Sequence, residues 1–173
     1  MIALLRHGDT GFTGFRGSLD DALTPLGWQQ MEAACAGHGW ARIVSSPRQR
    51  CAAFARQLAA AHHCPLALDD RLTELHFGDW EGQTAAELMT RDADALGRFW
   101  QDPDRHPPPG GETMSRFSQR VLAVWRELAC VENCLVITHG GVIRRILCEV
   151  RGLPLSQLLT LEVPHASLHR IGA

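Results

Sequence analysis

Two histidines in this chain each follow a short apolar run and precede a glycine. His7 follows residues 2–6 (IALLR), and His139 follows residues 134–138 (CLVIT). A run of this kind before glycine is typical of a buried parallel strand that ends in a turn, and ligands of open α/β sheets bind outside such carboxyl ends. We therefore expect both imidazoles to lie at the same edge of one sheet.

Arg6 and His7 are successive residues, and together they suggest chemistry on phosphorus. Imidazole is a competent nucleophile toward phosphorus, and a guanidinium group binds phosphoryl oxygens with two parallel hydrogen bonds. Gly8 would allow the backbone to approach a bound group closely. The pair predicts a site for a phosphorylated ligand.

Arg48 follows the run Ile43-Val44-Ser45-Ser46-Pro47, and we place it in the first turn of a helix that starts at Pro47. A cation there opposes the helix dipole by several tenths of a kcal/mol, so a bound phosphate would explain it. The alternative is a solvated charge beside Arg50. Arg50 itself we interpret as a solvated charge.

The segment 71–82 (RLTELHFGDWEG) combines charge, aromatic rings and glycine. Transfer of a phosphoryl group to histidine requires a proton for the leaving alkoxide, and a carboxyl partly shielded from water can hold it. We choose Glu74 as this donor and expect Asp79 and Glu81 to fix the loop through hydrogen bonds. The residue types alone do not rank the three securely.

The elements that must position these residues alternate along the chain. Strand-like runs at 2–6, 42–46, 66–68, 134–138 and 167–171 are separated by helical patterns at 25–36, 47–61, 83–101 with a break, 114–129 and 141–150. This alternation predicts an α/β fold with three layers, α/β/α, around a mostly parallel sheet. We expect a single domain over residues 1–173.

Residues 102–111 (DPDRHPPPGG) are too rich in proline and glycine for regular structure. We predict a loop there. It either borders the site or is an ordinary surface connection.

Charge and cysteine content restrict the class of protein. The formal net charge of −2 argues against a nucleic-acid-binding face, and all 17 basic residues are arginine, a good bidentate partner of phosphate. The six cysteines contain no Cys-x-x-Cys pair, and we see no targeting or membrane segment, so we expect a cytoplasmic protein. We expect no metal at Cys130 and Cys134, no cofactor and no membrane partner; a homodimer stays open.

Taken in order, these motifs resemble the histidine phosphatases, the superfamily that also contains the cofactor-dependent phosphoglycerate mutases. The matching segments extend over nearly the whole chain: LRHGDT at 5–10, LTPLGWQQ at 23–30, SSPR at 45–48, Glu74 with FGDWEG at 77–82, GGET at 110–113 and THGG at 138–141. Each motif alone is weak, but their order and spacing together are specific.

The resemblance implies roles for individual residues. His7 would be the nucleophile that becomes phosphohistidine, Arg6 and Arg48 would hold the phosphoryl oxygens, and Glu74 would donate the proton. His139 would complete and charge the phosphate pocket, and the backbone N–H of Gly140 would face the phosphate. The family often has Asn where this chain has Thr13, whose hydroxyl can donate one hydrogen bond.

The chain has little room for the long segment that closes over the site in the mutases, so we expect hydrolysis. Residues 15–27 and 76–82 are most similar to the α-ribazole phosphatases, which implies a small phosphomonoester, α-ribazole 5′-phosphate, as substrate. Arg16 would contact a second anionic group or pair with Asp20 or Asp21. Trp100 and the prolines at 107–109 would offer a flat wall for a ring, although core packing is the more ordinary role of Trp100. A broad-specificity phosphatase, a phosphoglycerate mutase and a non-catalytic phosphate-binding module are the alternatives.

Overall fold

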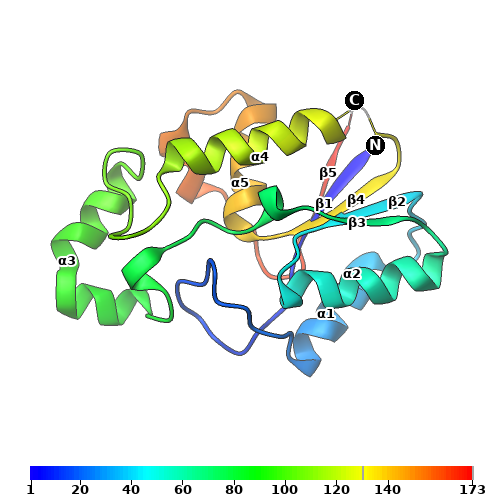
Figure 1. Cartoon of the computed structure of the whole chain (residues 1–173), viewed down its shortest axis with the longest axis horizontal. Helices are drawn as coiled ribbons and strands as arrows, with labels where there is room; N and C mark the ends of the chain where they lie inside the picture. Colours follow the sequence, from blue (N-terminus) through cyan, green and yellow to red (C-terminus); the bar gives the residue numbers. More distant parts are fainter. Residues whose placement is uncertain (130, 173) are drawn as a thin grey trace.

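The computed structural model describes residues 1–129 and 131–172. Five strands form one sheet in the order β3-β2-β4-β1-β5 (Figure 1). The strands are β1 (Ile2–Arg6), β2 (Arg42–Ser45), β3 (Leu66–Leu68), β4 (Cys134–Thr138) and β5 (Leu168–Ile171). The pairs β1–β4, β2–β4 and β2–β3 are parallel and β5 pairs antiparallel with β1, so the expected mostly parallel α/β sheet is confirmed.

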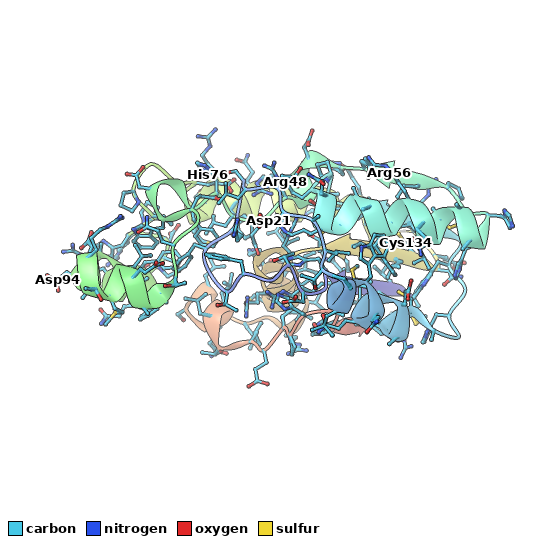
Figure 2. The ribbon with its side chains drawn as sticks, turned by 90° about the horizontal axis from the view of Figure 1, so that it is seen from below. Asp21, Arg48, Arg56, His76, Asp94 and Cys134 are labelled. Atoms are coloured by element: carbon cyan, nitrogen blue, oxygen red, sulfur yellow. The ribbon has the colours of Figure 1, made fainter. Side chains whose placement is uncertain are left out.

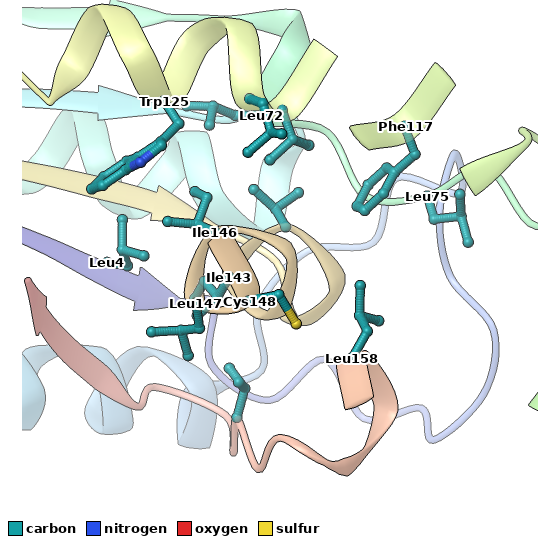
Figure 3. Packing of buried hydrophobic residues seen from close by; sticks show 14 of the residues in the cluster. Leu4, Leu72, Leu75, Phe117, Trp125, Ile143, Ile146, Leu147, Cys148 and Leu158 are labelled. Carbon is teal, nitrogen blue, oxygen red and sulfur yellow. The ribbon is translucent and has the colours of Figure 1, made fainter. Parts of the chain in front are cut away.

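Alternate residues of the strands face two separate cores. Leu4, Val44 and Val136 pack with the helices α4 (Met114–Leu128) and α5 (Gly140–Arg151), as Figure 3 shows for Leu4, Trp125 and Ile146. Leu5, Ile43 and Ile137 pack on the opposite face with α1 (Pro25–Cys35) and α2 (Gln49–His62). A strand buried on both faces needs apolar residues at every position, which explains the continuous apolar runs in the sequence.

The helix α3 (Ala85–Gln101) extends the molecule beyond the carboxyl ends of the strands. In Figure 2 its residue Asp94 lies at one end of the molecule and Arg56 of α2 lies toward the other. The predicted break in this helix is present at Asp92, whose φ of −154° and ψ of 62° are not helical. None of the helices in the described part of the chain has the length and hydrophobicity that a membrane span needs.

Of the two helix starts predicted from a hydroxyl residue followed by proline, one is confirmed and one is wrong. Thr24 caps α1 as expected, because its hydroxyl accepts the backbone N–H of Gly27. The predicted start of the next helix at Pro47 is wrong: α2 begins at Gln49, with Arg48 as an N-cap that makes no side-chain capping bond. The Ser46 hydroxyl accepts the backbone N–H of Arg48 at 3.4 Å and is also hydrogen-bonded to His139 at 2.8 Å.

The proline-rich segment 102–111 is irregular, as predicted. Its end packs against the loop after Glu74, because Asp79 N donates to the Pro109 carbonyl (2.8 Å) and Glu112 N donates to that of His76 (2.8 Å). Gly78 makes this approach possible, since its φ is +55° and a Cβ there would lie 2.1 Å from the Pro109 oxygen. The segment therefore supports the loop rather than lining the cavities described below.

Candidate active site

A cavity of about 140 Å³ lies at the carboxyl edge of the parallel strands. Five arginine or histidine side chains and one carboxylate line it. Its lining consists of Arg6, His7, Thr10, Phe12, Gly14, Phe15, Arg16, Arg50, Glu74, Phe77 and His165. A larger cavity of about 390 Å³ between α1 and α2 contains no arginine. Concentrated positive charge makes the smaller cavity the candidate anion site.

His7 presents one free ring nitrogen to this cavity. Its Nδ1 lies 2.8 Å from the carbonyl oxygen of Gly8, which accepts only, so Nδ1 carries the proton and Nε2 carries the lone pair. Burial lowers the pKa of His7 well below its usual value against the effect of that hydrogen bond, and the guanidinium groups of Arg50 and Arg6 lower it further. The ring is therefore a neutral nucleophile at neutral pH.

His139 lies directly behind His7 and is completely buried. The two rings meet edge to face with centroids 5.3 Å apart. Arg50 Nε can only donate, so His139 Nδ1 accepts from it (3.2 Å), and Nε2–H donates to the Ser46 hydroxyl (2.8 Å). Burial and then Arg50 lower its pKa well below the usual value. His139 is therefore neutral in the ligand-free protein, and its side chain is not part of the cavity lining, so its predicted contribution of charge to the pocket stays a prediction.

Arg50, which we interpreted as a solvated charge, is 1 % exposed and lines the cavity. Besides its bond to His139, it donates to the carbonyl oxygens of Leu19 (2.6 Å), Arg16 (3.2 Å) and Gly17 (3.2 Å). Arg48 stands two residues earlier, half-buried, and is not on the cavity lining. Figure 2 labels Arg48 at the start of α2. The solvated interpretation of Arg50 is thus wrong, and the structure does not bring Arg48 into the cavity.

Arg6 ends β1 and packs beside the start of α5. Its Nη1 donates to the Val163 carbonyl (2.6 Å), while its buried Nε has no partner among the described residues. A Cβ on Gly140 would lie in ordinary van der Waals contact with that Nε, at 3.5 Å, so the guanidinium group packs directly on the first residue of α5. The Nε atoms of Arg16 and Arg48 are also buried without a partner among the described residues, but only Arg6 and Arg16 line the cavity, where a phosphoryl oxygen would supply an acceptor.

Glu74 lies between this cavity and a second, mainly apolar cavity of about 180 Å³. Its two carboxylate oxygens accept the backbone N–H of Leu75 (3.0 Å) and of Gly141 (2.9 Å), the latter in the first turn of α5. A Cβ on Gly141 would lie 2.3 Å from Glu74 Oε1. Glycine at this position is therefore required for the carboxylate to reach the helix.

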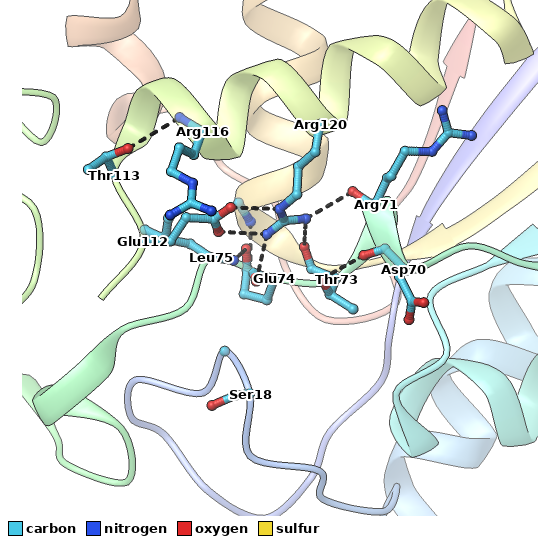
Figure 4. Close-up of polar contacts among 12 residues, drawn as sticks. Ser18, Asp70, Arg71, Thr73, Glu74, Leu75, Glu112, Thr113, Arg116 and Arg120 are labelled. Carbon is cyan, nitrogen blue, oxygen red and sulfur yellow. Dashed lines mark hydrogen bonds and ion pairs between the residues drawn. The ribbon is translucent and has the colours of Figure 1, made fainter. Parts of the chain in front are cut away.

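The backbone that carries Glu74 is held by Arg120 of α4 (Figure 4). The Arg120 guanidinium donates to the carbonyl oxygens of Arg71 (2.9 Å), Thr73 (2.6 Å) and Glu74 (3.0 Å). It also makes a bidentate ion pair with Glu112 at 2.8 Å. A single planar guanidinium thereby joins α4 and Glu112 to the segment 71–74, which carries the proton-donor candidate.

Glu81 fixes the loop opposite Glu74, as the sequence predicts. Its carboxylate accepts backbone N–H groups of Gly17, Ser18, Leu19 and Phe77 at 2.9–3.2 Å. Burial alone would raise the pKa of Glu81, but these hydrogen bonds outweigh it and leave the pKa below its usual value. No such bond is recorded for the Asp79 side chain within the described residues, so its predicted role stays a prediction.

Arg16 and Thr13, both in the N-terminal loop, lie in different parts of the site. Arg16 pairs with Asp21 (2.8 Å) and lies over the Phe12 ring, 3.8 Å from its centroid. Thr13 is exposed and lines an outer compartment of about 360 Å³ rather than the inner cavity. The expected pairing of Arg16 with a neighbouring aspartate is present, and Thr13 is not brought to the inner cavity.

Comparison with known proteins identifies the family. The model of the histidine phosphatase superfamily (branch 1) matches residues 2–173. The chain belongs to the histidine phosphatase superfamily. It is thus a phosphomonoester hydrolase by family.

Named relatives of this histidine phosphatase differ in their substrates. The glucosyl-3-phosphoglycerate phosphatase of Mycolicibacterium vanbaalenii is 33% identical over 88% of this chain and 75% of its own length. The adenosylcobalamin/alpha-ribazole phosphatase of Escherichia coli is 29% identical over 87% of this chain and 79% of its own. The native structure of a mycobacterial glucosyl-3-phosphoglycerate phosphatase superposes with a TM-score of 0.84 and 28% identity, covering 96% of this chain and 87% of that one.

Sequence reasoning missed Arg50 and His165 in this histidine phosphatase. Arg50 shares a helix face with the buried Phe54, four residues on, and that spacing was a usable signal. His165 lies in a turn without periodic pattern, where no local signal exists. Cys130 lies outside the described residues, and within them no cluster of His, Cys, Asp and Glu fits a metal ion. The homodimer and the cytoplasmic location stay predictions.

Proposed function

We propose that this histidine phosphatase hydrolyses its substrate through a phosphohistidine formed on Nε2 of His7. The observation that carries the proposal is one cavity in which a neutral imidazole with a free Nε2 meets the guanidinium groups of Arg6 and Arg50 and the carboxyl group of Glu74. Each group has a separate task in a phosphoryl transfer.

The reaction has two steps. In the first, His7 Nε2 forms a bond to phosphorus while the ester P–O bond breaks, and Glu74 gives its proton to the leaving alkoxide. In the second, water attacks phosphorus, the P–N bond breaks, and Glu74 takes the proton from that water. The products are an alcohol and inorganic phosphate, and the free His7 returns.

Arg6 and Arg50 would hold the non-bridging oxygens in both steps, because charge on these oxygens is stabilised by fixed donors. Gly140 N–H remains a candidate donor to the same group, at the start of α5. His139 would act through others: it packs on His7 and orients Arg50. Arg48 and Thr13 do not line the inner cavity, and this proposal gives them no contact with the phosphoryl group.

As substrate we propose α-ribazole 5′-phosphate. The support is the apolar cavity that adjoins Glu74, on the side where the leaving group must receive its proton. Its walls include Phe77, Phe99, Leu159 and the 45 % exposed Trp100, and these suit a flat aromatic ring. The proline segment 107–109, which we expected beside Trp100, is not among its lining residues.

Two arginines bear on an acidic leaving group in opposite ways. The Arg16 charge is already paired with Asp21, and bidentate recognition of a carboxylate would require breaking this pair. Arg144 lines the cavity beside Glu74 and forms no ion pair within the described residues, so a carboxylated leaving group is the alternative that the substrate test decides.

The test measures hydrolysis in EDTA with α-ribazole 5′-phosphate, glucosyl-3-phosphoglycerate and a chromogenic aryl phosphate. We expect turnover of the aryl ester, the highest kcat/KM for α-ribazole 5′-phosphate, and acid-labile phosphate trapped on the wild type but not on His7→Asn. A folded protein that turns over none of them would be a non-catalytic module. Bisphosphate-stimulated transfer between phosphoglycerate hydroxyls would indicate a mutase, and a higher kcat/KM for glucosyl-3-phosphoglycerate would reject the proposed substrate.

A further inference from the structure

His165 is held beside the nucleophile by an unusual turn. The turn 164–167 closes with a bond from Ser167 N to the Pro164 carbonyl (3.1 Å), and Ala166 in it has a φ of 54°. Left-handed backbone costs a residue with a Cβ about 1–2 kcal/mol. Such a conformation persists only where the surroundings enforce it.

Two backbone hydrogen bonds enforce it here. Ala166 N donates to the carbonyl of His7 (3.2 Å), and Arg6 N donates to the carbonyl of Ser167 (3.1 Å). The turn is therefore hydrogen-bonded to Arg6 and His7, two residues that line the cavity. These bonds hold the backbone of His165 at a fixed position relative to the backbone of His7.

The His165 ring stands at the boundary between two compartments. Its centroid is 5.5 Å from that of His7, and it lines both the inner cavity and the outer compartment. Among the described residues no group is hydrogen-bonded to either of its ring nitrogens, whereas both nitrogens of His139 have partners. Of these two rings beside His7, only His165 is free to bond a ligand.

Burial and a neighbouring positive charge favour the neutral form of His165 in the free enzyme. Burial lowers its pKa and Arg6 lowers it further, while Asp9 acts in the opposite direction. A neutral imidazole has one N–H donor and one acceptor. Beside a bound phosphoryl group, which offers only acceptors, the N–H is the useful partner.

We infer that His165 is a further catalytic residue, whose ring N–H donates to a non-bridging oxygen of the phosphoryl group on its way to and from His7. This inference rests on the proposed function. It gives the phosphoryl group a donor from the C-terminal turn, in addition to those from β1 and α2. Removal of one such donor typically costs 10²–10³-fold in rate; since His165 is partly exposed, we expect about 10–100-fold.

The test compares two variants that separate hydrogen bonding from packing. His165→Phe keeps a ring against His7 and removes the donor, whereas His165→Asn removes the ring and keeps an N–H donor. We expect kcat/KM for an aryl phosphate to fall about 10–100-fold in His165→Phe and less than about 5-fold in His165→Asn. Inhibition by inorganic phosphate should weaken in the Phe variant only. The exposed His106 supplies matched controls, His106→Phe and His106→Asn, with unchanged rates.

Several results would overturn the inference. Full activity of His165→Phe, or equal losses in both folded variants, would reduce His165 to a packing residue. If the Phe variant does not fold, as judged by circular dichroism, His165→Ala replaces it, and added imidazole should restore its rate; no rescue, with the Asn variant also impaired, rejects the donor role. An inactive wild type would reject the proposed function itself, while an active wild type with an unaffected Phe variant rejects only His165.

Discussion

At the scale of single residues, the cavity separates two arginines that the sequence places only two positions apart. Arg50 is buried, lines the cavity and contacts His139, whereas Arg48 is the N-cap of α2 outside it. Replacement of Arg50 by Gln should therefore lower kcat/KM at least about 100-fold, and Arg48→Gln less than about 5-fold. Arg50→Gln also leaves buried carbonyl groups without donors, so it should destabilise the fold by about 2–3 kcal/mol.

Steady-state kinetics on both variants, at a temperature where each is folded, measures this difference. Phosphate inhibition provides a readout that does not depend on turnover, and it should weaken with Arg50→Gln alone. A larger loss with Arg48→Gln than with Arg50→Gln would mean that Arg48 binds the phosphoryl oxygens, as the sequence motif suggested.

At the scale of elements, the first turn of α5 positions the proton donor, and one glycine makes this contact possible. A Cβ in Gly141→Ala would lie 2.3 Å from the Glu74 carboxylate, which must then swing away and lose the Gly141 N–H. We expect kcat to fall about 10–100-fold, because general acid catalysis of this kind contributes 10²–10⁴-fold.

The same substitution should leave stability within about 1 kcal/mol of the wild type. Ala gains about 0.5–1 kcal/mol over Gly in a helix, which offsets part of the lost hydrogen bond. Gly97 of α3 is the matched control, since a Cβ there meets no atom within 4 Å. Urea denaturation and kinetics on both variants test the claim, and a Gly141→Ala enzyme with wild-type kcat would contradict it.

Elements also explain what the sequence could predict. The strands, and with them the meeting of His7 and His139, follow from local apolar runs that need burial on both faces. The start of α2 does not, because the Ser46 hydroxyl also contacts His139, which is far away in the sequence, and the helix begins two residues later than predicted. That delay misled the choice between Arg48 and Arg50. His165 depends on bonds between the last turn and β1, which no local pattern encodes.

At the scale of the whole molecule, two buried neutral histidines make stability depend on pH. The pKa values of His7 and His139 are lowered well below 6.5 in the fold, mainly by burial. Below pH 6.5 the unfolded chain thus binds protons that the folded chain refuses, so stability is complete above pH 6.5 and falls as the pH drops below it. The carboxylates with lowered pKa, such as Asp69 and Glu81, add their own loss only below about pH 4.5.

Between pH 7.5 and 5.5 the change in stability therefore reports the histidines and not the carboxylates. One histidine that stays neutral loses about 1.4 kcal/mol over this window, so His7 and His139 together should lower the free energy of unfolding by about 3 kcal/mol. Burial also lowers the pKa values of His165 and His169, which add to this loss. Urea denaturation at both pH values measures the difference. In His7→Asn the loss should shrink by about 1.4 kcal/mol, while replacement of the exposed His76 by Asn should leave it unchanged. An equal unfolding free energy at pH 7.5 and 5.5 would mean that His7 and His139 accept protons within the fold, and a protonated His7 could not serve as the nucleophile.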